Sequence, residues 1–369
     1  MLKSIQVTLN SFVWKIYFHD RKKKIELILN DNAKAAEAVN LIYVTDKEPG
    51  INRIKKGKGF SYKIENKKID NADLKRIKAL VIPPAWESVW ICKLENGHLQ
   101  VTGLDVKNRK QYRYHTNWNK IRNQSKFYHL YDFGLSLPQM RTQLKKDIAL
   151  PGLPVEKVLA TVVSLMEKTS IRVGNSEYEK LNGSFGLATL KDKHVSFNGS
   201  KIEFSFKGKS GVEHQINLKS KKLANIVQSC KEIPGRELFQ YFNDNGEKKS
   251  IDSGMVNAYI KNISSGYFTS KDFRTWAGTV HAVVALHEFG LFESEIEAKK
   301  NITDTFKIVS SHLGNTVNVC KKYYVHPLII EAYENKKLSD LFSKIDNSIA
   351  EVDNALSPME EIVMQIIKP

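Results

Sequence analysis

The sequence predicts an α+β fold, in which a small antiparallel, β-rich N-terminal domain precedes a largely α-helical domain that carries a small sheet and hairpin. Short apolar runs separated by Gly, Asn and Pro fill residues 42–120, a pattern typical of antiparallel strands. Beyond Ser125 the apolar residues recur at helical spacing. Because 369 residues exceed the usual size of one domain, two domains are expected.

Three segments follow from these changes of pattern. Residues 1–40 form an N-terminal extension of unknown role that ends in an Ala-rich helix candidate, Asn32 to Leu41. Residues 41–121 form the β-rich domain, and residues 122–369 form the mainly helical domain.

The β-rich domain contains four β-type runs and one basic cluster. The runs are Leu80 to Pro84, Ser88 to Leu94, His98 to Gly103 and Gln111 to His115. The cluster consists of Arg53, Lys55, Lys56 and Lys58. It fits the positioning of a phosphate backbone, and it also fits a solvated loop.

The second domain has clear helix boundaries. A helix opens at Pro154, with one apolar face formed by Val155, Val158, Leu159, Val162, Val163 and Met166. Residues 186–218 then alternate as a small sheet whose last hairpin turns at Lys207 to Gly211. Further helices are expected at Asp252 to Ile263, at Ser270 to Glu288 with Gly290 as stop, and at Ser294 to His312 with Gly314 as stop.

The net charge of the chain points to a polyanionic partner. Lys and Arg number 57 against 40 Asp and Glu, which gives a formal charge of +17. Nucleic acid is the expected polyanion. A membrane surface would attract the same charge, but the chain has no apolar run of about 18 residues and no lipidation signal. The first residues lack a small-residue cleavage site, so a cytoplasmic protein is expected.

The cysteines and histidines predict no metal or cofactor. Cys92, Cys230 and Cys320 are scattered and lack CxxC spacing, so we expect reduced, partly buried thiols. His281, His312 and His326 are interpreted as structural residues.

Tyr323 and Tyr324, near the end of the chain, are the candidate nucleophiles. They follow the Gly314 helix stop and two lysines. A tyrosine that attacks a DNA phosphodiester needs cations around the phosphate, because the equatorial oxygens gain charge in the transition state. Neighbouring arginines would also favour the phenolate. In isolation, either tyrosine could be a half-buried core residue.

Two upstream segments could supply arginines to that phosphate. Arg172 follows the periodic helix in Thr169 to Asn175, although it could also be an ordinary surface arginine. Arg274 lies with Lys271 in the first turn or so of a helix that we expect Ser270 to cap, where free N–H groups attract anions. The same segment could simply be a helix N-terminus with a local ion pair.

The hairpin tip Phe206 to Gly211 carries the candidate general acid, Lys209. A departing 5′-oxygen is a poor leaving group unless it is protonated. The glycines on either side of Lys209 would let its side chain reach that oxygen, although an ordinary Gly-Lys-Ser turn has the same pattern. A phosphate-binding loop is excluded, because the position of its first glycine is Glu203.

Four segments carry Arg172, Lys209, Lys271 to Arg274, and the tyrosine pair, and we call them boxes. Taken together and in this order, they resemble those of the type IB DNA topoisomerases, specifically the small poxvirus-like form also found in bacteria. The resemblance covers roughly Leu41 to Tyr333. It matches Arg172, Lys209 and Arg274 to the family's catalytic residues, and the spacing from the Gly-Asn-Thr turn selects Tyr324 as the nucleophile. Asn315 stands where poxvirus members carry histidine. Ile82 to Trp86 and Arg109 to His115 also resemble the bacterial branch.

The resemblance implies an ATP-independent and metal-independent mechanism. Tyr324 would form a 3′-phosphotyrosyl bond while Lys209 protonates the leaving oxygen, and Arg172, Arg274 and Asn315 would hold the nonbridging oxygens. Lys271 would assist proton transfer or position the phosphate. It also implies a C-shaped clamp of two domains around double-stranded DNA, and a monomer is expected.

The strand before His115 is the expected DNA contact of the β-rich domain. Arg109, Lys110, Gln111, Tyr112, Arg113 and Tyr114 interleave basic, amide and aromatic side chains, and Gln111 could read an adenine edge. The alternative is an amphipathic edge strand with a solvated face. Arg53 and Lys58 are expected to contact phosphates.

Two other functions share parts of this pattern. A tyrosine recombinase uses the same arginine, lysine and tyrosine chemistry, but typically carries histidine at the position of Lys271 and lacks such a β-rich domain. A non-catalytic DNA clamp would not need a tyrosine beside three cationic boxes.

Overall fold

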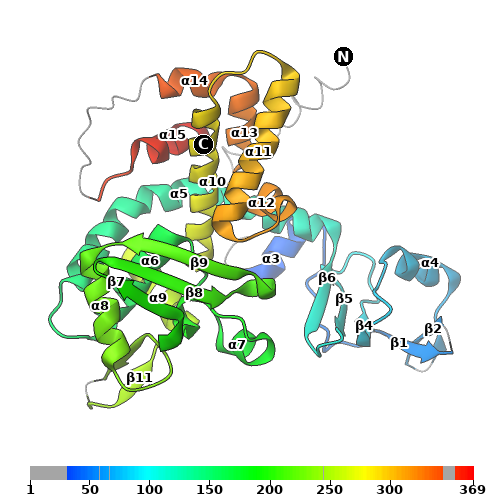
Figure 1. The fold of residues 1–369 in the computed structure, drawn as a ribbon. Coiled ribbons are helices and arrows are strands. Elements are labelled where there is room, and N and C mark those ends of the chain that lie inside the picture. The colour runs from blue at the N-terminus through cyan, green and yellow to red at the C-terminus, as the bar shows by residue number, and fades with distance from the viewer. Residues whose placement is uncertain (1–30, 58, 66, 244, 344–353) are drawn as a thin grey trace. The chain divides into compact units, whose positions relative to one another are not determined.

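The computed structural model describes residues 31–57, 59–65, 67–243, 245–343 and 354–369. They form two compact units that meet in the sequence between Tyr128 and His129. The C-shaped clamp around DNA remains a prediction. Figure 1 shows the strands of the first unit and the helices of the second.

A six-stranded antiparallel sheet forms the first unit, in the order β3-β2-β1-β4-β5-β6. Its strands are β1 Ile51–Lys56, β2 Gly59–Ile64, β3 Lys67–Lys68, β4 Glu87–Ile91, β5 Leu99–Leu104 and β6 Lys110–Tyr114. Two helices accompany it, α3 Asn32–Glu37 and α4 Asn71–Ala79. Ile77 of α4 packs against Ile51, Val89, Ile91 and Val101 to form the core of this sheet.

One of the two alternatives for the basic cluster of this unit is excluded, and one expected strand is absent. The basic cluster around Arg53 is not a loop, because Ile51 is fully buried and β1 pairs with β2 over five residue pairs. Leu80 to Pro84 is not a strand either. Leu80 caps the C-terminus of α4, Val81 has a φ of 47°, and the two prolines lack the N–H groups that a ladder needs.

Helix α5, Thr116–Ile148, runs through the sequence boundary between the units and also contains the predicted boundary at 121 and 122. The helix begins nine residues before Ser125, beyond which the sequence predicts helical spacing. In the second unit its apolar residues recur every three or four positions and are buried, namely Leu130, Phe133, Leu137, Met140, Leu144 and Ile148.

The second unit is a helical bundle around one core. Helix α6, Val155–Thr169, opens after Pro154 as expected and is almost wholly buried from Val158 to Met166. The remaining helices are α7 Ser176–Asn182, α8 Lys221–Glu232, α9 Ser253–Ser264, α10 Ser270–Phe289, α11 Glu295–Leu313, α12 Val317–Tyr323, α13 Pro327–Glu334, α14 Lys337–Phe342 and α15 Pro358–Ile367, with 3₁₀ turns at Leu187–Thr189, Asp192–His194 and Lys209–Gly211.

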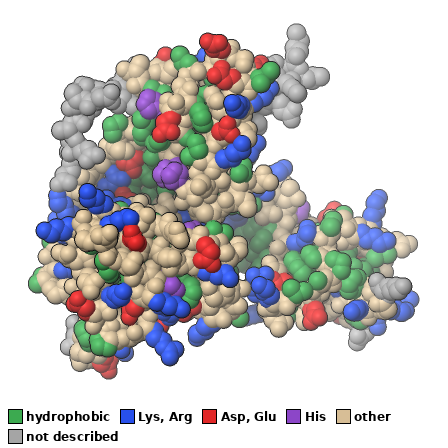
Figure 2. Space-filling model, viewed as in Figure 1, with side chains coloured by type: hydrophobic (Ala, Val, Ile, Leu, Met, Phe, Trp, Pro, Cys, Tyr) green, Lys and Arg blue, Asp and Glu red, His purple; other side chains and the backbone are tan. Residues whose placement is uncertain are grey.

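The predicted small sheet of this unit is confirmed. It is antiparallel and has the order β7-β8-β9, with β7 Val195–Asn198, β8 Lys201–Lys207 and β9 Glu213–Lys219. A separate pair, β10 Gln240–Phe242 and β11 Lys248–Ser250, lies after α8. The turn between β8 and β9 presents Lys209. Figure 2 shows Lys and Arg side chains gathered over this part of the second unit.

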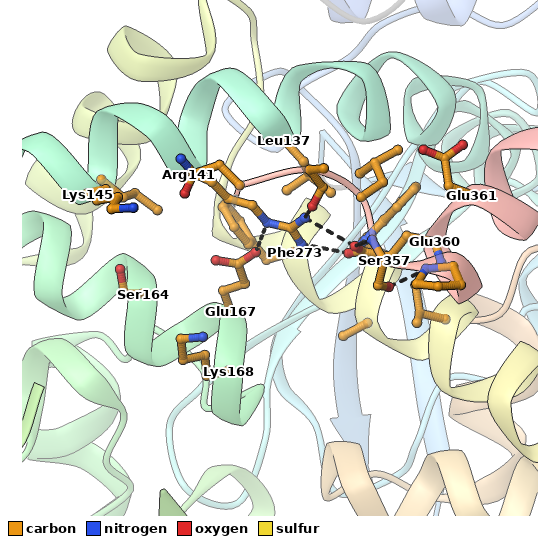
Figure 3. A pocket seen from close by; sticks show the side chains of 18 of the residues that line it. Leu137, Arg141, Lys145, Ser164, Glu167, Lys168, Phe273, Ser357, Glu360 and Glu361 are labelled. Atoms are coloured by element: carbon orange, nitrogen blue, oxygen red, sulfur yellow. Dashed lines mark hydrogen bonds and ion pairs between the residues drawn. The ribbon is translucent and has the colours of Figure 1, made fainter. Parts of the chain in front are cut away.

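Partly buried ion pairs connect the helix α15 to the bundle. Arg141 of α5 contacts Glu360 of α15 at 2.7 Å and Glu167 of α6 at 2.8 Å, as Figure 3 shows. Nε1 of Trp276 donates to the same Glu360 at 2.9 Å. These groups line a pocket of about 1260 Å³ that does not include the candidate catalytic residues. No helix among the described residues is long and apolar enough to cross a membrane.

Candidate active site

Arg172 lies in an extended segment that begins where α6 ends. Ser170 has a φ of 55° and reverses the chain there. The backbone oxygen of Arg172 accepts a bond from the N–H of Leu187 at 2.9 Å, which anchors the segment. The guanidinium Nη2 donates to Oδ1 of Asn315 and lies 3.4 Å from the carbonyl oxygen of Gly314. Arg172 and the Gly-Asn turn are thereby brought together.

Arg274 is a buried cation in the first turns of α10. Its side chain is 5% exposed, and it donates to the backbone oxygens of Ser170 and, at 2.7 Å, of Leu313. Burial and the nearby charge of Arg172 lower the pKa of Arg274 to about 10. Thr269, rather than the expected Ser270, caps the helix, because Asp272 closes a capping box with Thr269 while the N–H of Ser270 donates to Asn257.

The turn after α11 presents Asn315. Gly314 has a φ of 57° and ends the helix as expected, and the N–H of Asn315 donates to Ser310 at 3.0 Å. Nδ2 of Asn315 and Nε of Arg274 are buried and lack an oxygen or nitrogen acceptor among the described residues. A buried donor without an acceptor costs about 1–3 kcal/mol, so this site is suited to an anion.

Tyr324 is the C-terminal cap of α12 and packs against α10. A Cβ at Gly278 would lie 2.6 Å from the carbonyl oxygen of Tyr324, so only glycine allows this close approach. Thr279 of α10 donates to the same oxygen at 3.3 Å and accepts from the N–H of His326. One helix therefore carries Arg274 and also holds the tyrosine.

The electrostatic surroundings of Tyr324 favour its phenolate. Burial alone would raise the pKa of Tyr324, but the charges of Arg274, Arg172 and Lys209 outweigh it and lower that pKa. The guanidinium carbon of Arg274 lies 5.5 Å from the centre of the tyrosine ring. The adjacent Tyr323 has the ammonium of Lys322 5.3 Å from its ring centre.

The two lysines differ in their relation to this tyrosine. Lys209 is exposed at the hairpin tip, where Ser210 has a φ of 64°, and its charge acts on Tyr324. Lys271 is also exposed, but it is not among the main groups that shift the pKa of Tyr324. The structure thus groups Tyr324 with Arg274, with Arg172 and with Asn315, which is bonded to Arg172, and the charge of Lys209 also lowers the pKa of Tyr324.

His214 of β9 also reaches this site, although it is not among the residues predicted from the sequence. A Cβ at Gly314 would lie 2.4 Å from Cε1 of His214. Burial and then the charges of Arg172 and Arg274 lower the pKa of His214. One signal in the sequence could have pointed to it, since His214 lies three residues after Gly211, which ends the candidate hairpin turn.

The cysteines of this unit are more deeply buried than the partly buried thiols that were expected. Cys230 and Cys320 are free and buried, as Cys92 is in the first unit. His281 and His312 stack on each other with ring centres 4.4 Å apart, and His326 caps α13 through Nδ1.

In the first unit, the predicted DNA-contacting strand is the edge strand β6. Lys110, Tyr112 and Tyr114 occupy its exposed face, and the rings of the two tyrosines stack at 6.0 Å and 6°. Gln111 and Arg113 point to the other, half-buried face.

Two aspartates engage the polar side chains of this strand. Asp105 contacts Arg109 at 2.6 Å and accepts from Gln111 at 2.9 Å, and the bond with Arg109 lowers the pKa of Asp105 to about 2. Asp46 contacts Lys110 at 2.5 Å. The charges of Arg109 and Lys110 are thereby partly compensated.

Of the two remaining predicted contacts, Arg53 is engaged internally. Its guanidinium donates to the backbone oxygens of Pro83 at 3.1 Å and Trp86 at 2.5 Å, and it lies 4.2 Å from the ring centre of Phe60. Lys58 lies outside the described residues.

Comparison with known proteins decides the family. Residues 115–352 match the family model described as eukaryotic DNA topoisomerase I, catalytic core, which is more than half of the chain. The chain belongs to the type IB DNA topoisomerases. Residues 59–105 match the N-terminal domain of bacterial DNA topoisomerase IB.

Viral relatives of similar length support the small, poxvirus-like form of the family that the order of the four boxes predicts. DNA topoisomerase 1B of Acanthamoeba polyphaga mimivirus is 32% identical over 313 residues, which cover 81% of this chain and 92% of that protein. DNA topoisomerase 1B of vaccinia virus, strain Copenhagen, is 27% identical over 250 residues, which cover 66% of this chain and 74% of that protein. The chain is thus an isomerase whose substrate is DNA, which decides against the recombinase and the non-catalytic clamp.

Proposed function

We propose that Tyr324 is the nucleophile of a reaction that relaxes supercoiled DNA by cutting and resealing one strand. One observation carries this assignment. The guanidinium carbon of Arg274 lies 5.5 Å from the ring centre of Tyr324, and the positive charges of Arg274, Arg172 and Lys209, which come from three separate segments of the second unit, lower the pKa of Tyr324. Asn315, bonded to Arg172, completes the cluster.

In the proposed cleavage step, the phenolic oxygen of Tyr324 attacks the scissile phosphorus and its proton leaves to solvent. The bond between phosphorus and the 5′-oxygen breaks, and Lys209 gives its proton to that oxygen. A 3′-phosphotyrosyl bond remains. Arg172, Arg274 and Asn315 donate to the nonbridging oxygens, where charge develops in the transition state. Lys271 is assigned to phosphate positioning.

The reverse reaction reseals the strand. After the free 5′ end has rotated about the intact strand, its hydroxyl attacks the phosphotyrosyl phosphorus and returns a proton to Lys209. The bond between phosphorus and the Tyr324 oxygen breaks, and the released phenolate takes up a proton from solvent. Because the covalent bond keeps the energy of the phosphodiester, the cycle consumes no ATP. The fixed arginines supply the positive charge that a catalytic metal would otherwise provide.

For the first unit, we propose that β6 contacts the duplex. The exposed face with Lys110, Tyr112 and Tyr114 suits the groove and the backbone, and Arg109 and Arg113 suit phosphates. The amide of Gln111 suits a base edge, although its Nε2 group is held by Asp105. Arg53 is better explained as a support of the turn from Pro83 to Trp86.

We also propose that the protein acts as a monomer in the cytoplasm, at the nucleoid if its source is bacterial. All candidate catalytic residues lie in one unit of one chain, which supports a monomer. Its DNA substrate supports the location. Light scattering at several concentrations would reveal a dimer if one forms.

Plasmid relaxation tests the proposed reaction. Positively and negatively supercoiled plasmids should both relax in EDTA without ATP. A strict requirement for Mg²⁺ or ATP would contradict the mechanism. Denaturing the reaction with detergent should leave protein attached to the 3′ end of the nicked strand, and attachment to the 5′ end would also contradict it.

A further inference from the structure

His214 lies on the inner side of the hairpin that presents Lys209. It pairs in register with Phe206 across β8 and β9, and the two rings stack with centres 5.1 Å apart at an angle of 21°. Side chains alternate along β9, and His214 is half-buried between the exposed Glu213 and Gln215. The ring therefore faces into the second unit, and the proposed reaction gives it no role.

The imidazole fills the space between two glycines. A Cβ at Gly208 would lie 2.6 Å from Cδ2 and Nε2 of His214, and a Cβ at Gly314 would lie 2.4 Å from Cε1. Each glycine directly precedes a candidate catalytic residue, Lys209 or Asn315. The ring of His214 thus separates the hairpin tip at Gly208 from the turn that carries Asn315.

The charge around the ring favours its neutral form. Burial is the largest cause that lowers the pKa of His214. The charges of Arg172 and Arg274 lower it further, and the charge of Glu213 raises it. A protonated ring would add a third cation beside two arginines. A neutral ring can occupy this gap without repelling either of them.

We propose that His214 is a positioning residue, whose ring sets the distance between the Lys209 hairpin and the Gly314-Asn315 turn, so that Lys209 reaches the departing 5′-oxygen. This inference rests on the proposed function. It predicts that loss of the ring impairs proton donation and leaves the arginine contacts with the nonbridging oxygens in place.

The test compares two DNA substrates, one with the natural scissile 5′-oxygen and one with sulfur in its place. A thiolate leaves without protonation, so the sulfur substrate bypasses the general acid. His214→Ala should slow cleavage of the oxygen substrate by about 10- to 100-fold, since a misplacement of about 1 Å can cost about a hundredfold. Cleavage of the sulfur substrate should stay near the parent rate.

The variant His214→Phe distinguishes the role of the aromatic ring from that of the imidazole nitrogens. It keeps an aromatic ring against Phe206 and removes every imidazole proton. Its cleavage of the oxygen substrate should stay within a few-fold of the parent. A rate as low as that of His214→Ala would mean that the nitrogens act in the chemistry, and would overturn the positioning role.

His194→Ala is the matched control, because His194 is also a histidine beside a phenylalanine, with its ring centre 4.4 Å from that of Phe185, and it is buried. It should show no difference between the substrates. Thermal melting checks that each variant is folded.

The variant Lys209→Ala distinguishes failure of the general-acid role of Lys209 from failure of the positioning role of His214. If sulfur rescues Lys209→Ala but not His214→Ala, the general acid stands and the positioning role fails. If sulfur rescues neither, the assignment of Lys209 fails and the positioning role fails with it. Rescue of His214→Ala alone would make the histidine the proton source and would also overturn the proposal.

Discussion

Tyr323 and Tyr324 are adjacent in the chain, but the end of α12 gives them different surroundings. Tyr324 has the Arg274 guanidinium carbon 5.5 Å from its ring centre, and its backbone oxygen is held by Thr279 of α10. Tyr323 has the ammonium of Lys322 5.3 Å from its ring. Since nearby positive charge stabilises a phenolate, the buried arginine supports the proposal that Tyr324 is the nucleophile.

Tyr324→Phe should therefore abolish the covalent DNA adduct and leave noncovalent binding within about twofold, because only the phenolic oxygen is lost. Detergent trapping on labelled DNA and a filter-binding titration measure the two effects. Tyr323→Phe is the control and should trap DNA at the parent level. An adduct that persists in Tyr324→Phe and disappears in Tyr323→Phe would reverse the assignment.

Helix α10 links two parts of the catalytic cluster, since it carries Arg274 and packs Gly278 against Tyr324. Gly278→Ala places a methyl group 2.6 Å from the carbonyl oxygen of Tyr324, so the tyrosine must move. We expect cleavage to slow by about a hundredfold, the cost of a misplacement of about 1 Å. DNA binding should change little.

Single-turnover cleavage and a binding titration separate the two effects of this variant. The control is Gly254→Ala in the first turn of α9, where the added methyl group meets only the side chain of Asp252. Parent-like cleavage by Gly278→Ala would show that the position of Tyr324 does not depend on this contact.

Helix ends could be predicted from the sequence where one residue dictates the backbone. Gly290 and Gly314 end helices with a positive φ, and Pro154 precedes one, as expected. The capping residue of α10 was misplaced by one position. Thr269 and Ser270 are both good caps, and the bond between Asp272 and Thr269 decides between them.

Other features depend on contacts that a local pattern does not contain. For β1 the local pattern does not distinguish a strand from a solvated basic loop, because only Ile51 at its start is buried. His214 is separated from Gly314 by a hundred residues, so its place between two glycines follows from the packing of β9 against the turn after α11. The order of the basic boxes indicated Arg172, Lys209 and Arg274, but their action on Tyr324 required coordinates.

At the scale of the whole molecule, the buried carboxylate of Glu360 ties three helices of the second unit together. It accepts from Arg141 of α5 and from Trp276 of α10, while it belongs to α15. Burial raises the pKa of Glu360, but its bonds with Arg141 outweigh burial, and the net shift is downward. Its contribution to stability is therefore fully present above the ordinary carboxyl pKa of about 4.3 and is lost as the pH falls through the lower folded pKa.

Glu360→Gln should lower the melting temperature at pH 7 by several degrees, because removing one partner of a buried ion pair costs about 3 kcal/mol. Below about pH 4 the difference from the parent should shrink progressively, because the parent carboxyl group is protonated first in the unfolded state and only at lower pH in the folded state. Calorimetry between pH 3 and 8 measures both. Glu361→Gln, at the exposed neighbouring position, is the control. A difference that is constant over this range would mean that the charge of Glu360 does not stabilise the fold.

The positive charge of the chain should make DNA binding strongly salt-dependent, because each neutralised phosphate contributes about −0.9 to the slope of log K against log salt. The charge of Arg109 is already partly compensated by Asp105, 2.6 Å away. We therefore expect Arg113→Gln to reduce the magnitude of the slope by about 1, and Arg109→Gln to reduce it less.

Binding titrations between 50 and 300 mM salt give these slopes. Lys75→Gln, which removes an exposed charge from α4, should leave the slope unchanged. If Arg113→Gln also leaves it unchanged, β6 does not contact the phosphate backbone, and the DNA-binding surface of the first unit must be sought on another strand.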